Sequence, residues 1–357
     1  MKLISRSSAA KALSLAAVSA LVLSGCAAAP EEDATDAAAV DFLACAVSDE
    51  GSWNDKSFNE AVLDGLTRAE SELGVTIKEA ESTSSDDYEP NLQVMVDAGC
   101  DVTFGVGFLL VDPINKIAEA NTDVNLAIVD GWSNGATNLK PIYYSMNQSS
   151  FLAGYLAAEY STSKVIGTYG GAQIPSVTDF MTGYYFGAKQ WGIDNDTEVE
   201  VLGWDPANPD GGDFMGGFAP NSPESLGIAK TQIQGGADVV LPVGGNQFTA
   251  VQTAIDELNP DAVMMGVDVD IAAGNPDLAK YILTSIEKRM AVSVFDVIKG
   301  LVDGAAFDVT PYVGTLENKG TAISPFYDFD GSLSADLKSR LAEIEAGIID
   351  GTYAPKG

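Results

Sequence analysis

Apolar runs alternate with helical patterns along this chain, and the alternation begins a second time near residue 164. In the first series, helices at 58–73, 88–99 and 110–121 separate expected strands at 40–49, 75–82, 100–107 and 125–131. In the second, helices at 176–192, 224–236 and 248–258 separate strands at 164–171, 198–204, 237–245 and 262–270. Strands that alternate with helices form parallel sheets with right-handed crossovers. The sequence therefore predicts an α/β protein, and its 357 residues are enough for two lobes with separate cores.

The expected strand ends carry the polar residues of interest. They read "SDEGSWND", "GVGF", "VDGW", "YGGAQIPS", "PVGGNQF" and "GVDVD". Ligands of open parallel sheets bind beyond the carboxyl ends of the strands. Glycine allows close approach of the backbone, and Asp or Asn offers acceptors for hydroxyl groups. We expect a binding cleft where these ends face one another, although each end taken alone is also typical of an ordinary strand-to-helix turn.

The first of these ends is the most informative. Asp49, Trp53, Asn54, Asp55 and Phe58 fall within ten residues at a strand-to-helix turn. One interpretation is structural, since Asp or Asn can cap the helix and a Phe can join its apolar face. The other is a site for a flat ligand that carries hydroxyl groups. A single turn can serve both purposes.

Composition excludes several functional classes. The chain has 19 basic and 51 acidic residues, a formal net charge of -32, so it repels the phosphate backbone of nucleic acids. This charge fits solubility or a salty habitat. Histidine is absent, which removes Ser-His-Asp catalysis and histidine metal sites. The pair Asp268 and Asp270 alone does not make a glycosidase, and the loop 205–213 does not match a calcium loop. We expect no cofactor, no metal and no catalysis.

The N-terminus is interpreted as a targeting segment. Residues 1–25 contain three basic residues, an apolar run and small residues, as in a secretory signal peptide. The end, Leu23-Ser24-Gly25-Cys26, resembles the lipobox of bacterial lipoproteins, in which the Cys is lipidated after cleavage. Residues 26–39 are small and acidic and are expected to form a flexible tether. Cleavage changes the net charge from -32 to -35, because it removes three basic residues and no acidic one.

Two further cysteines, Cys45 and Cys100, are expected on neighbouring strands of the first lobe. Outside the cytoplasm such a pair can oxidise. Strand register decides whether the two Cα atoms come within the roughly 7 Å that a disulfide allows. The sequence leaves this open, and a catalytic thiol is not expected without a basic neighbour.

Several segments together resemble the basic membrane protein family of bacterial lipoproteins, also called purine nucleoside receptors, which are substrate-binding components of ABC importers. The matching pieces are "SDEGSWNDKSFNEAVLDGL", "GCDVTFGVGF", "QSSFLAGYLAA", "GGAQIPSVTDFMTGYYFGA", "GGADVVLPVGG", "GVDVD" and "ILTSIEKRM". The resemblance implies the type I periplasmic-binding-protein fold, with two Rossmann-like lobes joined by three hinge crossings. The N-terminal lobe is then 40–145 plus about 289–318, and the C-terminal lobe is 146–288 plus about 319–357.

The resemblance also implies roles for single residues. Phe58 matches an aromatic that stacks on the base, and Phe214 and Phe218 both fit the aromatic of the other lobe. The remaining matches are acidic residues that contact base or ribose, a lysine near a hinge crossing, and a glycine pair at the cleft wall: Asp49, Asp130, Asp268, Lys288, Gly244 and Gly245. The region 205–225 is longer and richer in Gly and Pro than the family pattern, and Ile271 stands where a Gln is common.

The expected function follows from the resemblance together with the residues. The protein is expected to be a monomeric, lipid-anchored protein that captures a nucleoside, a purine by resemblance, outside the membrane. It would deliver the nucleoside to an ABC permease. Alternatives are a sugar-binding protein of the same fold, a ligand-sensing lipoprotein, and a carboxylate-based exported hydrolase.

Overall fold

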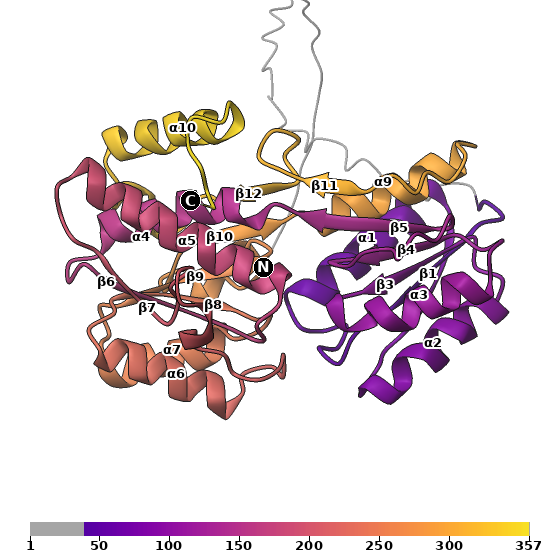
Figure 1. Cartoon of the computed structure of the whole chain (residues 1–357), viewed down its shortest axis with the longest axis horizontal. Helices are drawn as coiled ribbons and strands as arrows, with labels where there is room; N and C mark the ends of the chain where they lie inside the picture. The colour runs from indigo at the N-terminus through magenta and orange to yellow at the C-terminus, as the bar shows by residue number, and fades with distance from the viewer. Residues whose placement is uncertain (1–38, 357) are drawn as a thin grey trace, which may run out of the picture. The chain divides into compact units, whose positions relative to one another are not determined.

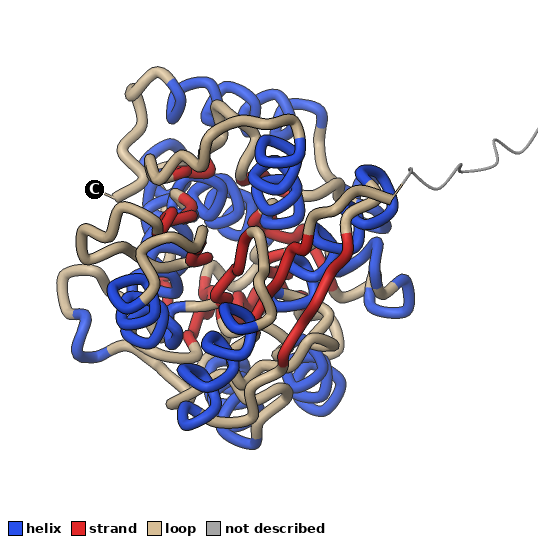
Figure 2. Tube along the Cα trace, turned by 90° about the vertical axis from the view of Figure 1, so that its right-hand side faces the viewer, coloured by secondary structure: helices blue, strands red, loops and turns tan. Residues whose placement is uncertain are grey.

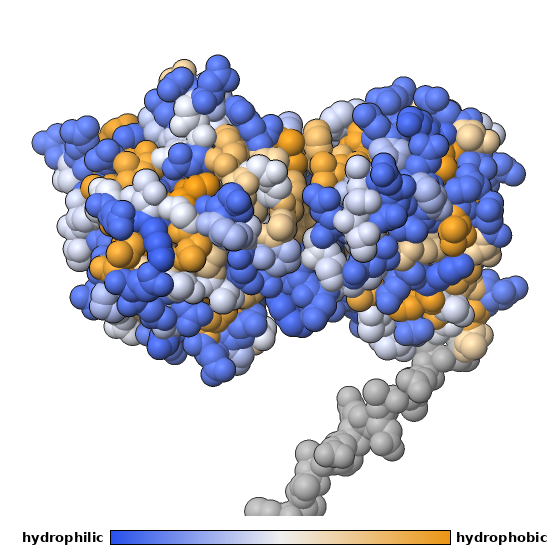
Figure 3. Space-filling model, turned by 90° about the horizontal axis from the view of Figure 1, so that it is seen from below, coloured by the Kyte–Doolittle hydropathy of each residue, from blue (hydrophilic) through white to orange (hydrophobic). Residues whose placement is uncertain are grey.

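The computed structural model describes residues 39–356. The expected signal peptide, Cys26 and almost all of the tether lie outside the described residues. Within residues 39–356, no helix combines the length and the apolar character needed to cross a bilayer. On the face shown in Figure 3, hydrophilic residues predominate and hydrophobic residues form scattered small groups.

The strands form two six-stranded sheets (Figure 1). The first sheet has the order β11-β5-β4-β3-β1-β2, and the second has the order β12-β10-β9-β8-β6-β7. Neighbouring strands are parallel except that β12 runs antiparallel to β10. The first sheet contains β1 (Leu43–Val47), β2 (Thr76–Ala80), β3 (Val102–Val106), β4 (Leu126–Val129), β5 (Leu139–Tyr144) and β11 (Tyr312–Gly314). The second contains β6 (Val165–Gly170), β7 (Glu200–Leu202), β8 (Val239–Val243), β9 (Val263–Asp268), β10 (Ile282–Lys288) and β12 (Thr321–Ile323).

Helices cover both faces of each sheet, as Figures 1 and 2 show. The first sheet lies between the helix pairs α1 (Phe58–Leu73) with α9 (Met290–Val302), and α2 (Ser85–Asp97) with α3 (Val111–Ala120). The second lies between α4 (Met146–Tyr160) with α5 (Pro175–Asp194), and α6 (Pro223–Gln234) with α7 (Phe248–Leu258). The remaining helices are α8 (Ile271–Gly274), α10 (Ala335–Ile349) and four 3₁₀ turns, η1 (Phe108–Leu110), η2 (Pro209–Gly211), η3 (Pro276–Leu278) and η4 (Tyr327–Ser332). Each sheet with its helices is called a lobe here, the first or the second.

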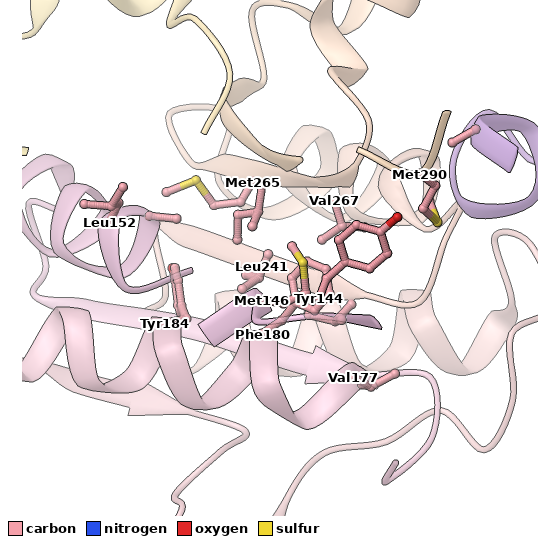
Figure 4. Packing of buried hydrophobic residues seen from close by; sticks show 14 of the residues in the cluster. Tyr144, Met146, Leu152, Val177, Phe180, Tyr184, Leu241, Met265, Val267 and Met290 are labelled. Carbon is pink, nitrogen blue, oxygen red and sulfur yellow. The ribbon is translucent and has the colours of Figure 1, made fainter. Parts of the chain in front are cut away.

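This architecture confirms the expected α/β fold with two parallel lobes. The chain passes between the lobes three times: from β5 to α4, from β10 to α9, and from β11 to β12. One hydrophobic core runs through both lobes on the side of α1, α9, α4 and α5 (Figure 4), and each lobe has a smaller core beneath its other helix pair.

Local sequence explains most element boundaries. α1 spans Phe58–Leu73 and ends at Gly74, whose left-handed backbone (φ 71°) closes the helix as expected. α2 begins at Ser85, three residues before the expected start, because Ser84 and Asp87 form a capping box. The sequence patterns predict no element after residue 270, so β10, α9 and α10 were missed together with β11 and β12. The last two have three residues each and are too short to show a periodicity.

Candidate functional site

A cavity lies where the carboxyl ends of the two sheets face each other. It encloses about 620 Å³ of empty space, part of it open to solvent. The first lobe contributes Asp49, Gly51, Asp55, Phe58, Asn59, Gly107, Phe108, Leu109 and Asp130. The second contributes Ile174, Ser176, Val177, Phe180, Phe218, Pro220, Val243, Gly244, Gly245, Asn246, Asp268 and Lys288.

Asp49 follows β1 and is buried in the wall of the first lobe. Its Oδ1 accepts hydrogen bonds from Asn59 Nδ2 (2.8 Å) and from the backbone N–H of Gly51 (2.9 Å). A Cβ atom on Gly107 would lie 2.7 Å from Asp49 Oδ2, so only glycine leaves room for this carboxylate. Burial raises the pKa of Asp49 to about 6, because desolvation outweighs the hydrogen bonds from Asn59 and Gly51.

Asp55 and Phe58 divide the two roles that the sequence suggested for this turn. The Asp55 carboxylate accepts hydrogen bonds from the backbone N–H groups of Ser57, Asn59 and Glu60, so Asp55 caps α1. Desolvation raises the pKa of Asp55 despite these bonds. Phe58, the first residue of α1, is half-buried and lines the cavity. The turn therefore supplies both a helix cap and an aromatic wall.

Two carboxylates and one ammonium group form the floor of the cavity. Lys288 Nζ lies 2.5 Å from Asp130 Oδ2 and 3.9 Å from Asp268 Oδ1, and all three side chains are buried. Desolvation raises the pKa of Asp130 and, to about 6, that of Asp268, although Lys288 opposes both shifts. The ammonium group also lies 5.1 Å from the ring centroid of Phe58 and 5.2 Å from that of Phe180, within reach of cation–π attraction.

The structure distinguishes the two second-lobe aromatics. Phe218 lines the cavity, and its ring lies against Gly171, where a Cβ atom would come within 2.5 Å of it. Phe214 packs edge-to-face on Trp204 at 5.9 Å between ring centroids and pairs through its backbone with Gly170. Phe218 therefore borders the cavity. Phe214 instead anchors the loop that contains Phe218, through its contacts with Trp204 and Gly170. Gly244 and Gly245 also line the wall.

Three other expected site residues do not reach the cavity. Trp53 is packed in the core, and its backbone N–H donates to Glu81 (3.0 Å). Asn54 is exposed to solvent. Asp270 caps α8 by accepting from the backbone N–H of Ala273 (3.2 Å). These placements correct the expectation that all the polar and aromatic residues of the two turns border one site.

Sequence reasoning named nine of the 21 lining residues and missed the other twelve, among them Asn59, Phe108, Phe180 and Asn246. Phe108 and Asn246 stand in strand ends that the sequence had singled out, so their position carried the signal. Phe180 follows Val177 on an apolar stripe of α5 and has the pattern of an ordinary core residue (Figure 4). Asn246 Oδ1 is buried and, among residues 39–356, has no hydrogen-bond partner.

Cys45 and Cys100 form a disulfide with their Cα atoms 6.0 Å apart. Cys45 lies in β1, but Cys100 precedes β3 rather than belonging to it. The disulfide joins β1 to the turn that precedes β3. It therefore lies towards the amino end of β3, whereas the cavity lies at the carboxyl ends of the strands.

The family model, a curated relative and a solved structure similar to this chain are all described as binding proteins of ABC transporters. The family described as "ABC transporter substrate-binding protein PnrA-like" matches residues 42–208. The "ABC transporter nucleoside-binding protein BmpA" of Lactococcus lactis subsp. cremoris is 28% identical over 96% of both chains. An uncharacterized lipoprotein of Pyrococcus horikoshii is 30% identical over 79% of this chain and 68% of its own. A solute-binding protein of an ABC transporter system from Aeropyrum pernix shares the fold, with a TM-score of 0.76 and 21% identity over 87% of this chain and 92% of that one.

Proposed function

Because this chain belongs to the Bmp family of PnrA-like ABC transporter substrate-binding proteins, we propose that its ligand is a nucleoside, which it holds between the lobes and delivers to an ABC permease. Proteins of this class bind a substrate and hand it on without chemical change, so the chain is not an enzyme. The fold is accordingly of the periplasmic-binding-protein type. The Lactococcus relative is named for nucleoside binding, and this supports the choice of ligand.

The observation that carries the proposal is the pairing of aromatic rings across the cavity. Phe58 comes from the first lobe, and Phe218 and Phe180 come from the second. A nucleobase is a flat π system, and stacking on an aromatic side chain is worth about 1–3 kcal/mol per base. Rings from both lobes can cover the two faces of one base when the lobes are closed. A simple sugar has no aromatic face, so it gains less from such a pair.

The carboxylates supply acceptors for the ribose hydroxyls and the base edge. Asp49, Asp130 and Asp268 are buried, and a charged acceptor in a desolvated site makes strong hydrogen bonds. Asn246 Oδ1 adds a neutral acceptor at the wall of the second lobe. With Asp55, the lining has four carboxylates against one ammonium group, and this excess of negative charge disfavours phosphorylated ligands. The set fits a neutral molecule with several hydroxyl or amino donors.

Location and domain division complete the proposal. We propose that residues 1–25 are removed, that lipid on Cys26 anchors the chain at the outer face of the cytoplasmic membrane, and that 26–39 is the tether. The division into lobes at 40–145 with about 289–318, and 146–288 with about 319–357, agrees with the sheet membership of β11 and β12. Relatives described as lipoproteins support the anchor.

Mass spectrometry of small molecules released from gently purified protein is the direct test. We expect a nucleoside, and titration calorimetry with purine nucleosides, pyrimidine nucleosides and free ribose then ranks the candidates. Purine nucleosides should bind more tightly than pyrimidine nucleosides, and ribose should bind weakly. Ribose or another free sugar binding as tightly as any nucleoside would replace this proposal with a sugar-binding protein of the same fold.

A further inference from the structure

Two buried polar contacts join the lobes beside the cavity. Ser57 Oγ of the first lobe donates a hydrogen bond to Asp268 Oδ2 of the second (2.9 Å). Lys288 of the second lobe pairs with Asp130 of the first (2.5 Å). All four side chains are buried, with at most 9% of each residue exposed. The hydroxyl of Ser57 is therefore one of the groups that must lose a partner when the lobes separate.

The position of Ser57 makes this contact unusual. Ser57 occupies the N-cap of α1, where a serine side chain normally accepts a hydrogen bond from the first turn. Here the side chain makes no capping bond, and the Asp55 carboxylate accepts from the backbone N–H groups of Asn59 and Glu60 instead. Because Asp55 provides the cap, the Ser57 hydroxyl is free to reach the other lobe.

Ser57 is also separate from the lining of the cavity. Asp268 borders the cavity and Ser57 does not. The bond from Ser57 occupies Asp268 Oδ2, while Oδ1 lies on the side of Lys288. Ser57 therefore fixes the orientation of a carboxylate at the site and bridges the lobes without meeting a ligand itself.

We propose that Ser57 is a positioning residue whose bond to Asp268 acts as a clasp, holding the lobes closed and setting how long a bound molecule stays. The inference rests on the proposed function only in that a ligand is held between the lobes. A hydroxyl-to-carboxylate bond out of water is stronger than the same bond in water, where both groups are hydrated. Losing the clasp favours the open form and shortens the lifetime of the complex, since such effects fall mainly on the dissociation rate.

The test compares Ser57→Ala and Ser57→Thr with Ser334→Ala. Ser334 is the matched control, because its side chain caps α10 in the second lobe (3.1 Å to the N–H of Leu337) and is remote from the clasp. Small-angle X-ray scattering of the ligand-free proteins reports lobe opening. Stopped-flow displacement of bound inosine reports release. Thermal melts verify that each variant is folded.

We expect Ser57→Ala to release inosine about tenfold faster, the factor that one hydrogen bond to a charged group is worth. Its association rate should change less than twofold, and its radius of gyration without ligand should increase. Ser57→Thr retains the hydroxyl and should stay close to the wild type, as should Ser334→Ala. A folded Ser57→Ala protein with unchanged scattering and unchanged release would overturn the clasp. Failure of the wild type to bind inosine would count against the nucleoside, and the ligand-free scattering would still decide the clasp.

Discussion

Two aspartates at the cavity have the same uncommon backbone. Asp130 (φ 58°), directly after β4, and Asp268 (φ 68°), the last residue of β9, are left-handed. Glycine adopts this conformation without strain, and Asp is among the few other residues that tolerate it. Both side chains meet Lys288. A strained backbone that carries a buried carboxyl group at the same point of both lobes supports the proposed binding role of these two side chains.

The aromatic wall gives the first prediction. Phe58→Ala and Phe218→Ala should each weaken nucleoside binding by about 1–3 kcal/mol, the value of one base stack. Phe214→Ala is the matched control, because its ring packs on Trp204 and does not border the cavity. Calorimetric titration measures the affinities and thermal melts measure stability. Since Phe58 is half-buried, its loss should cost less stability than the about 3–5 kcal/mol of a fully buried Phe. Normal nucleoside binding by a Phe58→Ala protein that melts at a lower temperature would contradict the stacking of a base on this ring.

Asp49 gives a prediction about pH. Burial raises its pKa from 3.8 to about 6, so the folded protein binds a proton between these values that the unfolded chain does not. The contribution of Asp49 to stability is then greatest at low pH and is lost as the pH rises through 6. Asp49→Asn removes the buried charge and should stabilise the ligand-free protein by about 2–3 kcal/mol at pH 8, with a gain that shrinks towards pH 4.

Urea unfolding from pH 4 to pH 8 measures this difference. Asp112→Asn, at an exposed position of α3, should show no such trend. Nucleoside binding should weaken in Asp49→Asn, because the neutral amide is a poorer acceptor than the carboxylate. A stability gain that is the same at every pH would contradict the assignment of the buried charge.

At the level of single residues, the sequence indicated nine of the 21 residues that line the cavity. Asp49, Phe58, Asp130 and Asp268 stand at strand ends or a first helical turn, and such positions can be identified from the pattern of apolar runs. What could not be identified was the direction of each side chain. Asp270 is chemically equal to the lining aspartates but turns back to cap its own helix, and Asp55 lines the cavity while its carboxylate caps α1. Only the local backbone decides between these uses.

At the scale of elements, the loop between β7 and α6 is built as an extension of the second sheet. The backbone N–H groups of Met215 and Gly216 donate to the carbonyls of Gly170 and Gly171 (both 2.9 Å), at the carboxyl end of β6. Gln232 of α6 binds the Asp213 carboxylate in this loop (2.9 Å). The Gly and Pro content of this loop hides the pairing from sequence patterns. Through this anchoring the loop carries Phe218 to the cavity.

The helices α4 and α5 approach each other unusually closely, and this gives an element-scale prediction. A Cβ atom on Gly187 of α5 would lie 2.0 Å from the carbonyl oxygen of Phe151 in α4. Gly187→Ala should therefore destabilise the protein by about 1–3 kcal/mol through overpacking. Gly300→Ala in α9 is the control, because nothing lies within 4 Å of its added Cβ, and it should stabilise by about 0.5–1 kcal/mol. Thermal melts of both variants measure the change in stability relative to the wild type. A Gly187→Ala protein that is as stable as the wild type, or more stable, would refute the close contact.

At the scale of the whole molecule, the shared core explains how binding and closure are linked. One hydrophobic cluster includes α1 and α9 of the first lobe and α4 and α5 of the second. Within it, Tyr144 at the end of β5 bonds Ser293 of α9, and its ring packs edge-to-face on Tyr312 of β11. These three residues border the three passages between the lobes. The lobes therefore share one continuous hydrophobic core. The polar contacts beside the cavity, Ser57 with Asp268 and Lys288 with Asp130, are the contacts that would break if the lobes separated.

The last prediction concerns how a chain of this charge stays at the cell surface. The mature protein is expected to carry a net charge of -35, so anionic lipid headgroups would repel it, and the proposed lipid anchor would hold it near a permease. Cys26 is the residue that the lipobox assigns to this role. Cys26→Ser should be released into the medium or remain unprocessed, and Ser24→Ala, which keeps the cysteine, is the control that should stay attached. Membrane fractionation and mass spectrometry of the N-terminal peptide measure both outcomes. Unchanged membrane retention of Cys26→Ser, with no lipid on the wild-type peptide, would rule out the anchor.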